Sequence, residues 1–162
     1  MNILDTGAKG LVGKNLTEAL KNIRDGKDRT HPSLKIENLY LYDIDSSMEE
    51  LNVACEKADF VFNLAGVNRP KDQSEFMSGN FGFASTLLDN LKKCKNNCPV
   101  MLSSSIQATL IGRYGESDYG KSKLAGENLF LDYSKDTGAP GGGHHRRADP
   151  GGLPVCECGF LY

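Results

Sequence analysis

Four short apolar segments divide the chain. They are residues 2–6, 39–43, 59–65 and 99–105, and each is bounded by polar or turn-forming residues. Short, continuous apolar runs of this kind are typical of β-strands that are buried on both faces of a sheet. We therefore predict four strands, separated by stretches that are long enough to hold helices.

Apolar residues recur at helical spacing in three of the remaining segments. These positions are Val12, Leu16, Ala19, Leu20 and Ile23, then Ala84, Leu87, Leu88 and Leu91, and finally Ala125, Leu129 and Tyr133. Residues 25–38 are polar and include Gly26 and Pro32, so we predict an exposed loop there. The alternation of strands and helices predicts an α/β fold, in which helices cover both faces of a doubly wound parallel sheet in three αβα layers.

The last part of the chain has a different composition. Residues 139–162 contain six of the eighteen glycines and three of the six prolines, without a helical or strand period. We predict one domain, residues 1–138, followed by a tail, 139–162, that is disordered or not native in origin. Because the alternation requires another strand near this point, we expect the fold to be incomplete at the C-terminus, through a truncation, a reading-frame slip or an artefact.

The overall composition is that of an ordinary globular protein and argues against several functions. Of the 162 residues, 39% are hydrophobic and 25% are charged, and the formal net charge is −2. This balance argues against a nucleic-acid partner, and no apolar run approaches the roughly 18 to 20 residues that span a membrane. The N-terminus lacks a signal-peptide pattern. Five cysteines, of which Cys55, Cys94 and Cys98 lie in segments that we predict to be helical, indicate reduced thiols in a cytoplasmic protein.

Two groups of residues have some resemblance to metal ligands. They are Cys94 with Cys98, and His144 and His145 with Cys156 and Cys158. Neither group has the paired C-x-x-C spacing that is usual for zinc, so we predict no metal site.

A glycine-rich loop joins the first strand to the first helix. Residues 7–13 read Gly-Ala-Lys-Gly-Leu-Val-Gly, the pattern G-x-x-G-x-x-G. In a Rossmann-like fold, Gly7 permits the tight turn, Gly10 the close approach of a diphosphate and Gly13 the close packing of the helix. The helix N-terminus adds free N–H groups and the positive end of its dipole, so we predict a dinucleotide-binding loop rather than a merely structural turn. Its further cofactor contacts would come from Lys9, Leu11 and Val12.

Asp43 lies at the carboxyl end of the second predicted strand. In dinucleotide-binding folds an acidic residue at this place accepts hydrogen bonds from the adenosine ribose, and its charge repels the 2′-phosphate of NADP. We therefore expect NAD or NADP as the cofactor, with NAD favoured by Asp43. The alternatives stay open, because Asp43 could be a solvated loop carboxylate beside Asp45, and Lys9 or Arg69 could bind a phosphate.

Candidate catalytic residues follow the fourth predicted strand. Tyr119 and Lys123 form a Y-x-x-x-K pattern at the start of a predicted helix, where a spacing of four puts both side chains on one face. A phenol has an ordinary pKa near 10, and a nearby cation lowers it towards the neutral range. Ser105 ends a run of three serines at the strand end, where a hydroxyl can hold a substrate carbonyl. We predict Ser105, Tyr119 and Lys123 as the catalytic set, with Tyr119 and Lys123 also contacting the cofactor.

With these motifs in this order, residues 1–138 resemble the extended short-chain dehydrogenases/reductases of the NAD-dependent epimerase/dehydratase family. Residues 64–70 (Leu-Ala-Gly-Val-Asn-Arg-Pro) and 103–108 (Ser-Ser-Ser-Ile-Gln-Ala) are similar to the capsular-polysaccharide branch of that family. The resemblance implies reduction of a nucleotide-linked 4-keto-6-deoxy sugar in capsular or surface polysaccharide biosynthesis, and a homodimer in the full-length family. It also implies that hydride passes from the nicotinamide to the sugar carbonyl carbon while the tyrosine protonates the alkoxide.

The resemblance assigns further residues and leaves rival functions open. Asn80 would lie on the helix behind the active site. Ile106 and Gln107 stand where dehydratases of the family have an Asp-Glu pair, which argues against dehydration. The rivals are a nucleotide-sugar 4-epimerase, which uses the same groups, and a dinucleotide-binding module without catalysis. The predicted lining of the cofactor groove consists of Leu64, Ala65 and Gly66.

Two departures from the family bear on activity. Asp5 replaces an apolar residue at the end of the first strand, where a buried carboxylate must be paired or protonated and would oppose a diphosphate. Family members also continue with further strands, a substrate-binding lobe and, in this branch, a cupin domain, none of which follows residue 138. We therefore expect the cofactor half of an enzyme, which can be inactive by itself.

Overall fold

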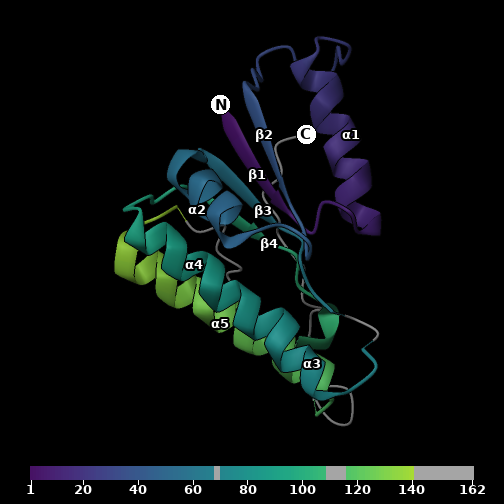
Figure 1. The fold of residues 1–162 in the computed structure, drawn as a ribbon, viewed down its shortest axis with the longest axis vertical. Coiled ribbons are helices and arrows are strands. Elements are labelled where there is room, and N and C mark those ends of the chain that lie inside the picture. The colour runs from purple at the N-terminus through teal and green to yellow at the C-terminus, as the bar shows by residue number, and fades with distance from the viewer. Residues whose placement is uncertain (68–69, 109–115, 141–162) are drawn as a thin grey trace, which may run out of the picture.

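A parallel β-sheet with helices against both faces forms the described part of the chain (Figure 1). The computed structural model describes residues 1–67, 70–108 and 116–140. In chain order the elements are β1 (Asn2–Thr6), α1 (Leu11–Arg24), β2 (Asn38–Tyr42), α2 (Met48–Lys57), β3 (Phe60–Asn63), α3 (Ser74–Phe76), the π-helical turn η1 (Met77–Gly82), α4 (Phe83–Lys93), β4 (Val100–Leu102), the 3-10 turn η2 (Ile106–Ala108) and α5 (Asp118–Thr137). Arg69 and residues 141–162 of the predicted tail lie outside the described residues.

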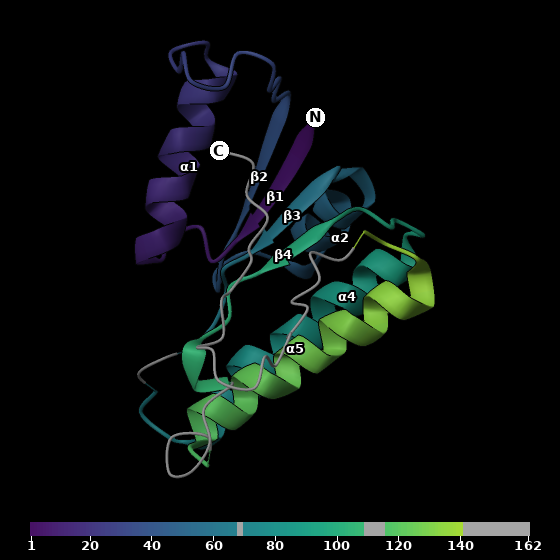
Figure 2. The ribbon, with the colours of Figure 1, turned by 180° about the vertical axis from the view of Figure 1, so that it is seen from behind.

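The four strands are parallel and lie in the order β2-β1-β3-β4. Leu4 in β1 is opposite Tyr40 in β2 and Val61 in β3, and Val61 is opposite Val100 in β4. Helix α1 covers one face of the sheet, while α2, α4 and α5 cover the other, as two opposite views show (Figures 1 and 2). The predicted Rossmann-like αβα arrangement is therefore confirmed for the described residues.

The strand order reverses between β1 and β3. β2 lies on one side of β1, whereas β3 and β4 follow on the other side. In open α/β sheets a crevice forms at such a reversal, outside the carboxyl ends of the strands, and ligands bind there. The glycine loop after β1 and the segments after β2, β3 and β4 all start at this edge, so the fold gathers the predicted motifs there.

Two apolar cores hold the helices on the sheet. The larger core lies under α2, α4 and α5, and its fully buried side chains include Leu4, Leu51, Val61, Leu87 and Leu91. The smaller core lies under α1 and contains the buried side chains of Ile3, Leu20 and Ile36. Consecutive residues of a strand face opposite sides of the sheet, which is why Ile3 and Leu4 belong to different cores. None of the described helices is long and apolar enough to cross a membrane.

The three predicted helices are present, and in α1 the predicted positions Leu16, Leu20 and Ile23 lie in or against the core, whereas two other predicted positions are exposed. In α4 the predicted positions Ala84, Leu87, Leu88 and Leu91 are all buried. In α5 Tyr133 is buried, while Ala125 and Leu129 are half-buried. In α1 the buried positions are Gly13, Thr17 and Leu20, whereas Val12 and Ala19 are exposed. The missing side chain of Gly13 lets the helix approach the loop at that position.

Three strands end earlier than predicted. β3 ends at Asn63 instead of residue 65, and β4 ends at Leu102 instead of residue 105, since the pairing of these strands stops at Asn63 opposite Leu102. β2 likewise ends at Tyr42, one residue before Asp43. The predicted site residues beyond these ends therefore lie in loops at the edge of the sheet. They are Asp43, Leu64, Ala65 and Ser105.

Two other local predictions were wrong. The loop 25–38 is not wholly exposed, because Ile36 is buried in the core under α1 and because β2 already begins at Asn38. Cys98 is not in a helix but in the segment between α4 and β4. Lys95 has a φ of 54° just after α4, and the Asn96 side chain accepts a hydrogen bond from the Cys98 N–H (3.0 Å), so the helix cannot continue there.

Neither the helix α2 nor the turn η1 was among the elements predicted from the sequence. A capping box begins α2, because the Ser47 hydroxyl accepts from the Glu50 N–H (3.2 Å) and the Glu50 carboxylate accepts from the Ser47 N–H (2.7 Å). The pattern Ser-x-x-Glu was therefore the signal available in the sequence. No comparable capping pattern marks η1, which continues into α4.

Candidate cofactor and active site

Two glycines of the loop after β1 occupy positions that a side chain would disrupt. Gly7 has a φ of +81°, and a Cβ there would lie 2.7 Å from the backbone nitrogen of Ala65. A Cβ on Gly13 would lie 2.1 Å from the Gly7 carbonyl oxygen. Both distances are well below van der Waals contact, so the loop, the start of α1 and the segment after β3 pack backbone against backbone.

The first turn of α1 presents backbone amides at this edge. Gly10 precedes the helix, and its carbonyl oxygen accepts from the Lys14 N–H (3.0 Å). The amides of Leu11, Val12 and Gly13 come before that bond and have no acceptor within the helix. Three such amides, together with the positive end of the helix dipole, can bind a diphosphate.

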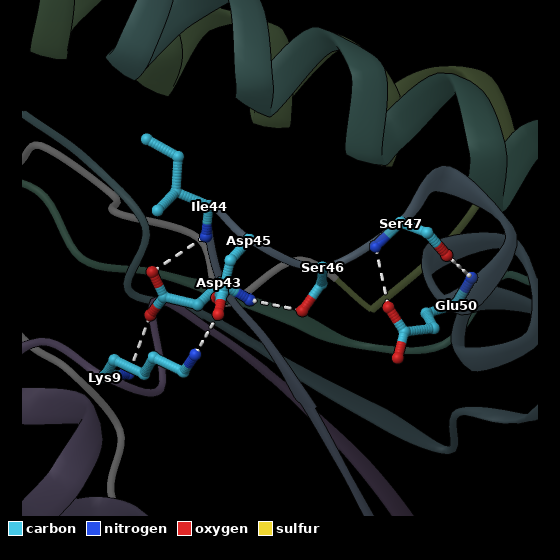
Figure 3. Close-up of polar contacts among 7 residues, drawn as sticks. All are labelled: Lys9, Asp43, Ile44, Asp45, Ser46, Ser47 and Glu50. Carbon is cyan, nitrogen blue, oxygen red and sulfur yellow. Dashed lines mark hydrogen bonds and ion pairs between the residues drawn. The ribbon is translucent and has the colours of Figure 1, made fainter.

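Asp43 follows β2 and lies against the glycine loop (Figure 3). Its carboxylate accepts hydrogen bonds from the backbone N–H groups of Lys9 (2.7 Å) and Ile44 (2.8 Å). The Lys9 ammonium forms an ion pair with Asp45. A cavity of about 380 Å³ opens beside these residues. Asp43 therefore lies against the backbone of the glycine loop.

Asp5 is fully buried in β1, with its carboxyl against α1. One carboxylate oxygen accepts from the Thr17 hydroxyl (3.0 Å), and the other has no partner among the described residues. Burial raises the pKa of Asp5 to about 6 despite the Thr17 hydrogen bond, and the negative charge of Asp43 adds to the rise. The predicted burial of this carboxyl is confirmed, and among the described residues one of its two oxygens has a hydrogen-bond partner.

Lys123 connects the end of β4 to Tyr119. Its ammonium donates to the Ser103 carbonyl oxygen (3.3 Å) and lies 5.8 Å from the centre of the Tyr119 ring. Burial lowers the pKa of Lys123, since a desolvated ammonium is less stable than a neutral amine. Ser105 lies two residues beyond Ser103, and its hydroxyl accepts from the Gln107 N–H (3.3 Å). The three predicted catalytic residues thus come from the two segments that Lys123 joins.

Aromatic packing supports Tyr119. Its half-buried ring meets the ring of Phe76 in α3 edge to face, with the ring centres 5.5 Å apart. Ser117 caps α5 by accepting from the Gly120 N–H (3.0 Å), which positions the first turn of that helix. The tyrosine is therefore held by a helix cap on its own element and by a ring from another element.

Asn80 joins three segments of the site. Its side chain accepts from the Val67 N–H (2.9 Å) and donates to the Val67 carbonyl (3.0 Å) and to the Ser122 hydroxyl (3.0 Å). Ser122 in turn donates to the Tyr119 carbonyl (2.8 Å). Sequence reasoning placed Asn80 near the site only through the family resemblance, and it missed Val67 and Ser122. The position of Ser122 inside the Y-x-x-x-K pattern was the one available hint.

Gly66 is the point where the loop after β3 meets Lys123. A Cβ on Gly66 would lie 2.9 Å from the Lys123 ammonium nitrogen and 2.6 Å from the Asn80 side-chain oxygen. A glycine here lets the ammonium approach the backbone of the segment predicted to line the cofactor groove. The segment after β3 therefore lies against both the glycine loop, through Ala65 and Gly7, and Lys123, through Gly66.

Cysteines and histidines contribute little to the described site. Cys55, Cys94 and Cys98 are free thiols, and burial raises the pKa of Cys55 to about 12 and that of Cys98 to about 11. Within residues 1–67, 70–108 and 116–140, no three His, Cys, Asp or Glu side chains are grouped closely enough to hold a metal ion. The predictions on His144, His145, Cys156 and Cys158 lie outside the described residues.

A glycine loop at the strand reversal, an acidic residue after β2 and a lysine beside a tyrosine near the end of β4 define a dinucleotide-binding α/β domain. The model of the NAD dependent epimerase/dehydratase family matches residues 3–142, and the chain belongs to this family. The cofactor class of this family is a nicotinamide dinucleotide.

Named relatives place the chain more closely. It is 33% identical over 140 residues to a UDP-2-acetamido-2,6-beta-L-arabino-hexul-4-ose reductase of Pseudomonas aeruginosa. It is also similar to the solved structure of the capsular polysaccharide assembling protein CapF from Staphylococcus aureus, with 38% identity and a TM-score of 0.65. A UDP-glucuronic acid 4-epimerase of Bacillus cereus, at 23% identity and a TM-score of 0.62, shares the fold. The predicted resemblance to the capsular-sugar branch is confirmed.

The alignments cover most of this chain but only part of each relative. They cover 86% of the chain for the reductase and 87% for CapF and for the epimerase. They cover 33% of the reductase, 34% of CapF and 55% of the epimerase. The chain therefore spans about a third of the length of the curated relative that it matches.

Proposed function

We propose that this chain binds a nicotinamide dinucleotide and carries the catalytic groups of an oxidoreductase that reduces a nucleotide-linked 4-keto-6-deoxy sugar. The observation that carries the proposal is the half-buried Lys123 ammonium between the end of β4 and the Tyr119 ring. The substrate class is supported by the names of two relatives, one a reductase of a UDP-linked hexulose and the other a capsular polysaccharide assembling protein. The composition and the family resemblance extend the proposal to a cytoplasmic homodimer that acts in capsular or surface polysaccharide biosynthesis.

Residues of the described chain fit such a cofactor at three points. The first-turn amides of α1 would bind the diphosphate, and Asp43 would accept from the adenosine ribose, which favours NAD over NADP. Lys123 would donate to the nicotinamide ribose, beside the groove lined by Leu64, Ala65 and Gly66. The bound nicotinamide would supply the hydride.

The chain's own residues would control the proton and the sugar oxygen. Tyr119 donates its phenolic proton to that oxygen as the carbonyl carbon is reduced, and Ser105 donates a hydrogen bond that orients the same oxygen. The Lys123 ammonium stabilises the negative charge that the phenolate carries after it has lost its proton. The Ser103 carbonyl holds this ammonium in place through a 3.3 Å hydrogen bond.

A nucleotide-sugar 4-epimerase is the second candidate function, because the family description includes epimerases and because Ser105, Tyr119 and Lys123 would serve both reactions. A reductase converts one NADH for each sugar reduced, whereas an epimerase interconverts two sugars without net consumption of cofactor. A binding module without catalysis would take up NADH and do neither.

The test follows NADH absorbance and sugar products when the purified chain is mixed with a UDP-linked 4-keto-6-deoxy sugar. We expect stoichiometric consumption of NADH, and a loss of rate of at least about a hundredfold in Lys123→Met. The matched control is Lys121→Met on the same helix as Lys123. It removes an exposed ammonium that pairs with Glu116, just before the helix, and should leave the rate unchanged. Saturable NADH binding without turnover would support the binding module, and failure to bind NADH and NADPH would overturn the proposal.

A further inference from the structure

Lys9 is the cation of the glycine loop, and its charge is already engaged. Its ammonium forms an ion pair with Asp45, which lies in the connection between β2 and α2 (Figure 3). Pairing with the Asp45 carboxylate raises the pKa of Lys9 and lowers that of Asp45, so both groups stay charged at neutral pH. The positive charge of Lys9 is therefore paired with a carboxylate from another element.

The connection that presents Asp45 is itself held at both ends. At the start, Asp43 accepts from the Lys9 backbone N–H (2.7 Å), and its own N–H donates to the Ser46 hydroxyl (3.1 Å). At the end, Ser47 forms the capping box with Glu50. Asp45 lies between these two anchors, so its carboxylate is directed at Lys9 by a preorganised turn.

The charged side chains beside the glycine loop bear on the choice between NAD and NADP. NADP differs from NAD by a phosphate on the adenosine ribose, which is the group that Asp43 is proposed to contact. A cavity of about 380 Å³ beside this loop is lined by the ammonium groups of Lys9, Lys14 and Lys21 and by the carboxylates of Asp43 and Glu18. Asp45 adds a third carboxylate, which pairs with Lys9. A phosphate entering here must therefore compete with Asp45 for the Lys9 ammonium.

We propose that Asp45 is a specificity-determining residue that keeps NADP out by holding the Lys9 ammonium. The inference rests on the proposed binding of a dinucleotide and deepens it. Asp43 and Asp45 then have separate roles, because the Asp43 carboxylate accepts from the loop backbone while the Asp45 carboxylate pairs with the loop's cation. When Asp45 is removed, Lys9 is free to bind the 2′-phosphate.

The experiment measures NAD⁺ and NADP⁺ binding to the purified chain by calorimetry, in the wild type and in Asp45→Asn. We expect Asp45→Asn to raise the affinity for NADP⁺ about fivefold, as for one exposed charge pair, and to change the affinity for NAD⁺ by less than twofold. The gain should shrink at high salt, because charges at an exposed site are screened. Both Lys9 and Asp45 are exposed, so the substitution leaves the packed cores intact.

Two further variants separate the ion pair from a general charge effect. Lys9→Gln combined with Asp45→Asn should abolish the gain in NADP⁺ affinity, since the released ammonium is then missing. Glu49→Gln removes an exposed carboxylate four residues away, on α2, and should leave the NADP⁺/NAD⁺ ratio as in the wild type.

Each unfavourable result has its own meaning. An unchanged ratio in Asp45→Asn, while the wild type binds NAD⁺, overturns the role of Asp45 and leaves the proposed function standing. An equal gain in Glu49→Gln also overturns that role, because any nearby carboxylate would then suffice. A wild-type chain that binds neither dinucleotide overturns the proposed function and this inference together.

Discussion

The carboxyl of Asp5 shows how strongly the surroundings of a single residue can change its chemistry. Its pKa is raised from an ordinary value of 3.8 to about 6, chiefly by burial. The folded protein therefore retains a proton that the unfolded chain releases as the pH rises from about 4 to about 6. Folding stability from this group is highest below pH 4, declines across that interval and stays low above it.

We predict that Asp5→Asn is more stable than the wild type at pH 7.5, by about 2 kcal/mol, and that the difference vanishes near pH 4. An amide keeps the acceptor for Thr17 but carries no charge that burial could penalise. Urea unfolding at the two pH values measures the difference. Asp89→Asn, at an exposed position, serves as the control. A pH-independent gain in stability in Asp5→Asn would contradict the raised pKa of Asp5.

Gly13 and Gly126 allow the same substitution to be compared at a crowded and at an open position. A Cβ on Gly13 would lie 2.1 Å from the Gly7 carbonyl oxygen, whereas a Cβ on Gly126 in α5 would have no atom outside its own helix within 4 Å. We predict that Gly13→Ala displaces the glycine loop and abolishes NADH binding. Gly126→Ala should raise the free energy of unfolding by about 0.5–1 kcal/mol, because alanine favours the helix. Fluorescence titration and thermal unfolding measure both effects, and undiminished NADH binding in Gly13→Ala would refute the role of this contact.

At the scale of elements, the site depends on how η1, the loop after β3 and α5 are joined. Asn80 makes three hydrogen bonds between them, to Val67 on one side and to Ser122 on the other. These contacts place Gly66 next to the Lys123 ammonium. The position of Lys123 relative to the loop after β3 thus depends on the side chain of Asn80.

We predict that Asn80→Ala lowers the free energy of unfolding by about 2–4 kcal/mol, since it removes the partner of the Val67 N–H and carbonyl and one of the hydrogen bonds of the Ser122 hydroxyl. It should also weaken NADH binding under conditions in which the variant is folded. The matched control is Asn90→Ala in α4, at a position that is equally buried, with 6% of each asparagine exposed. Equal losses of NADH affinity in the two variants would show that Asn80 acts on stability alone.

At the scale of the whole molecule, the two faces of the sheet are unequally covered. Among the described residues, the core under α1 has three buried apolar residues, whereas that under α2, α4 and α5 has twelve. The stability of a region follows the apolar surface that it buries, so α1 should open more readily than the opposite layer. The glycine loop belongs to the less stable side, since it leads directly into α1.

We predict that amide hydrogen exchange is faster in α1 than in α4. Leu20→Ala should raise exchange selectively in α1 and β2, while Leu87→Ala should destabilise the whole described domain by about 2–5 kcal/mol. Mass spectrometry of peptides from both helices after exchange measures this. Loss of protection in α4 to the same extent as in α1, after Leu20→Ala, would contradict the inequality of the two cores.

The four strands, the helices α1, α4 and α5 and the order of the motifs could be predicted from the sequence because each depends on neighbouring residues. The spacing of Ala84, Leu87, Leu88 and Leu91 was sufficient to identify the buried face of α4. In α1 the same reasoning identified Leu16, Leu20 and Ile23, but it missed Gly13 and Thr17, which are buried without an apolar side chain to mark them. The ends of β3 and β4 were misplaced because strand ends depend on where pairing with another strand stops.

The sequence by itself determined the α/β alternation, the glycine loop after the first strand and the Y-x-x-x-K pattern of Tyr119 and Lys123. Local apolar periods and backbone preferences are sufficient for such features. Only the tertiary structure decided that Asn80 holds Gly66 beside Lys123 and that Asp45 pairs with Lys9. These contacts join residues that are far apart in the chain, so they arise from the packing of whole elements.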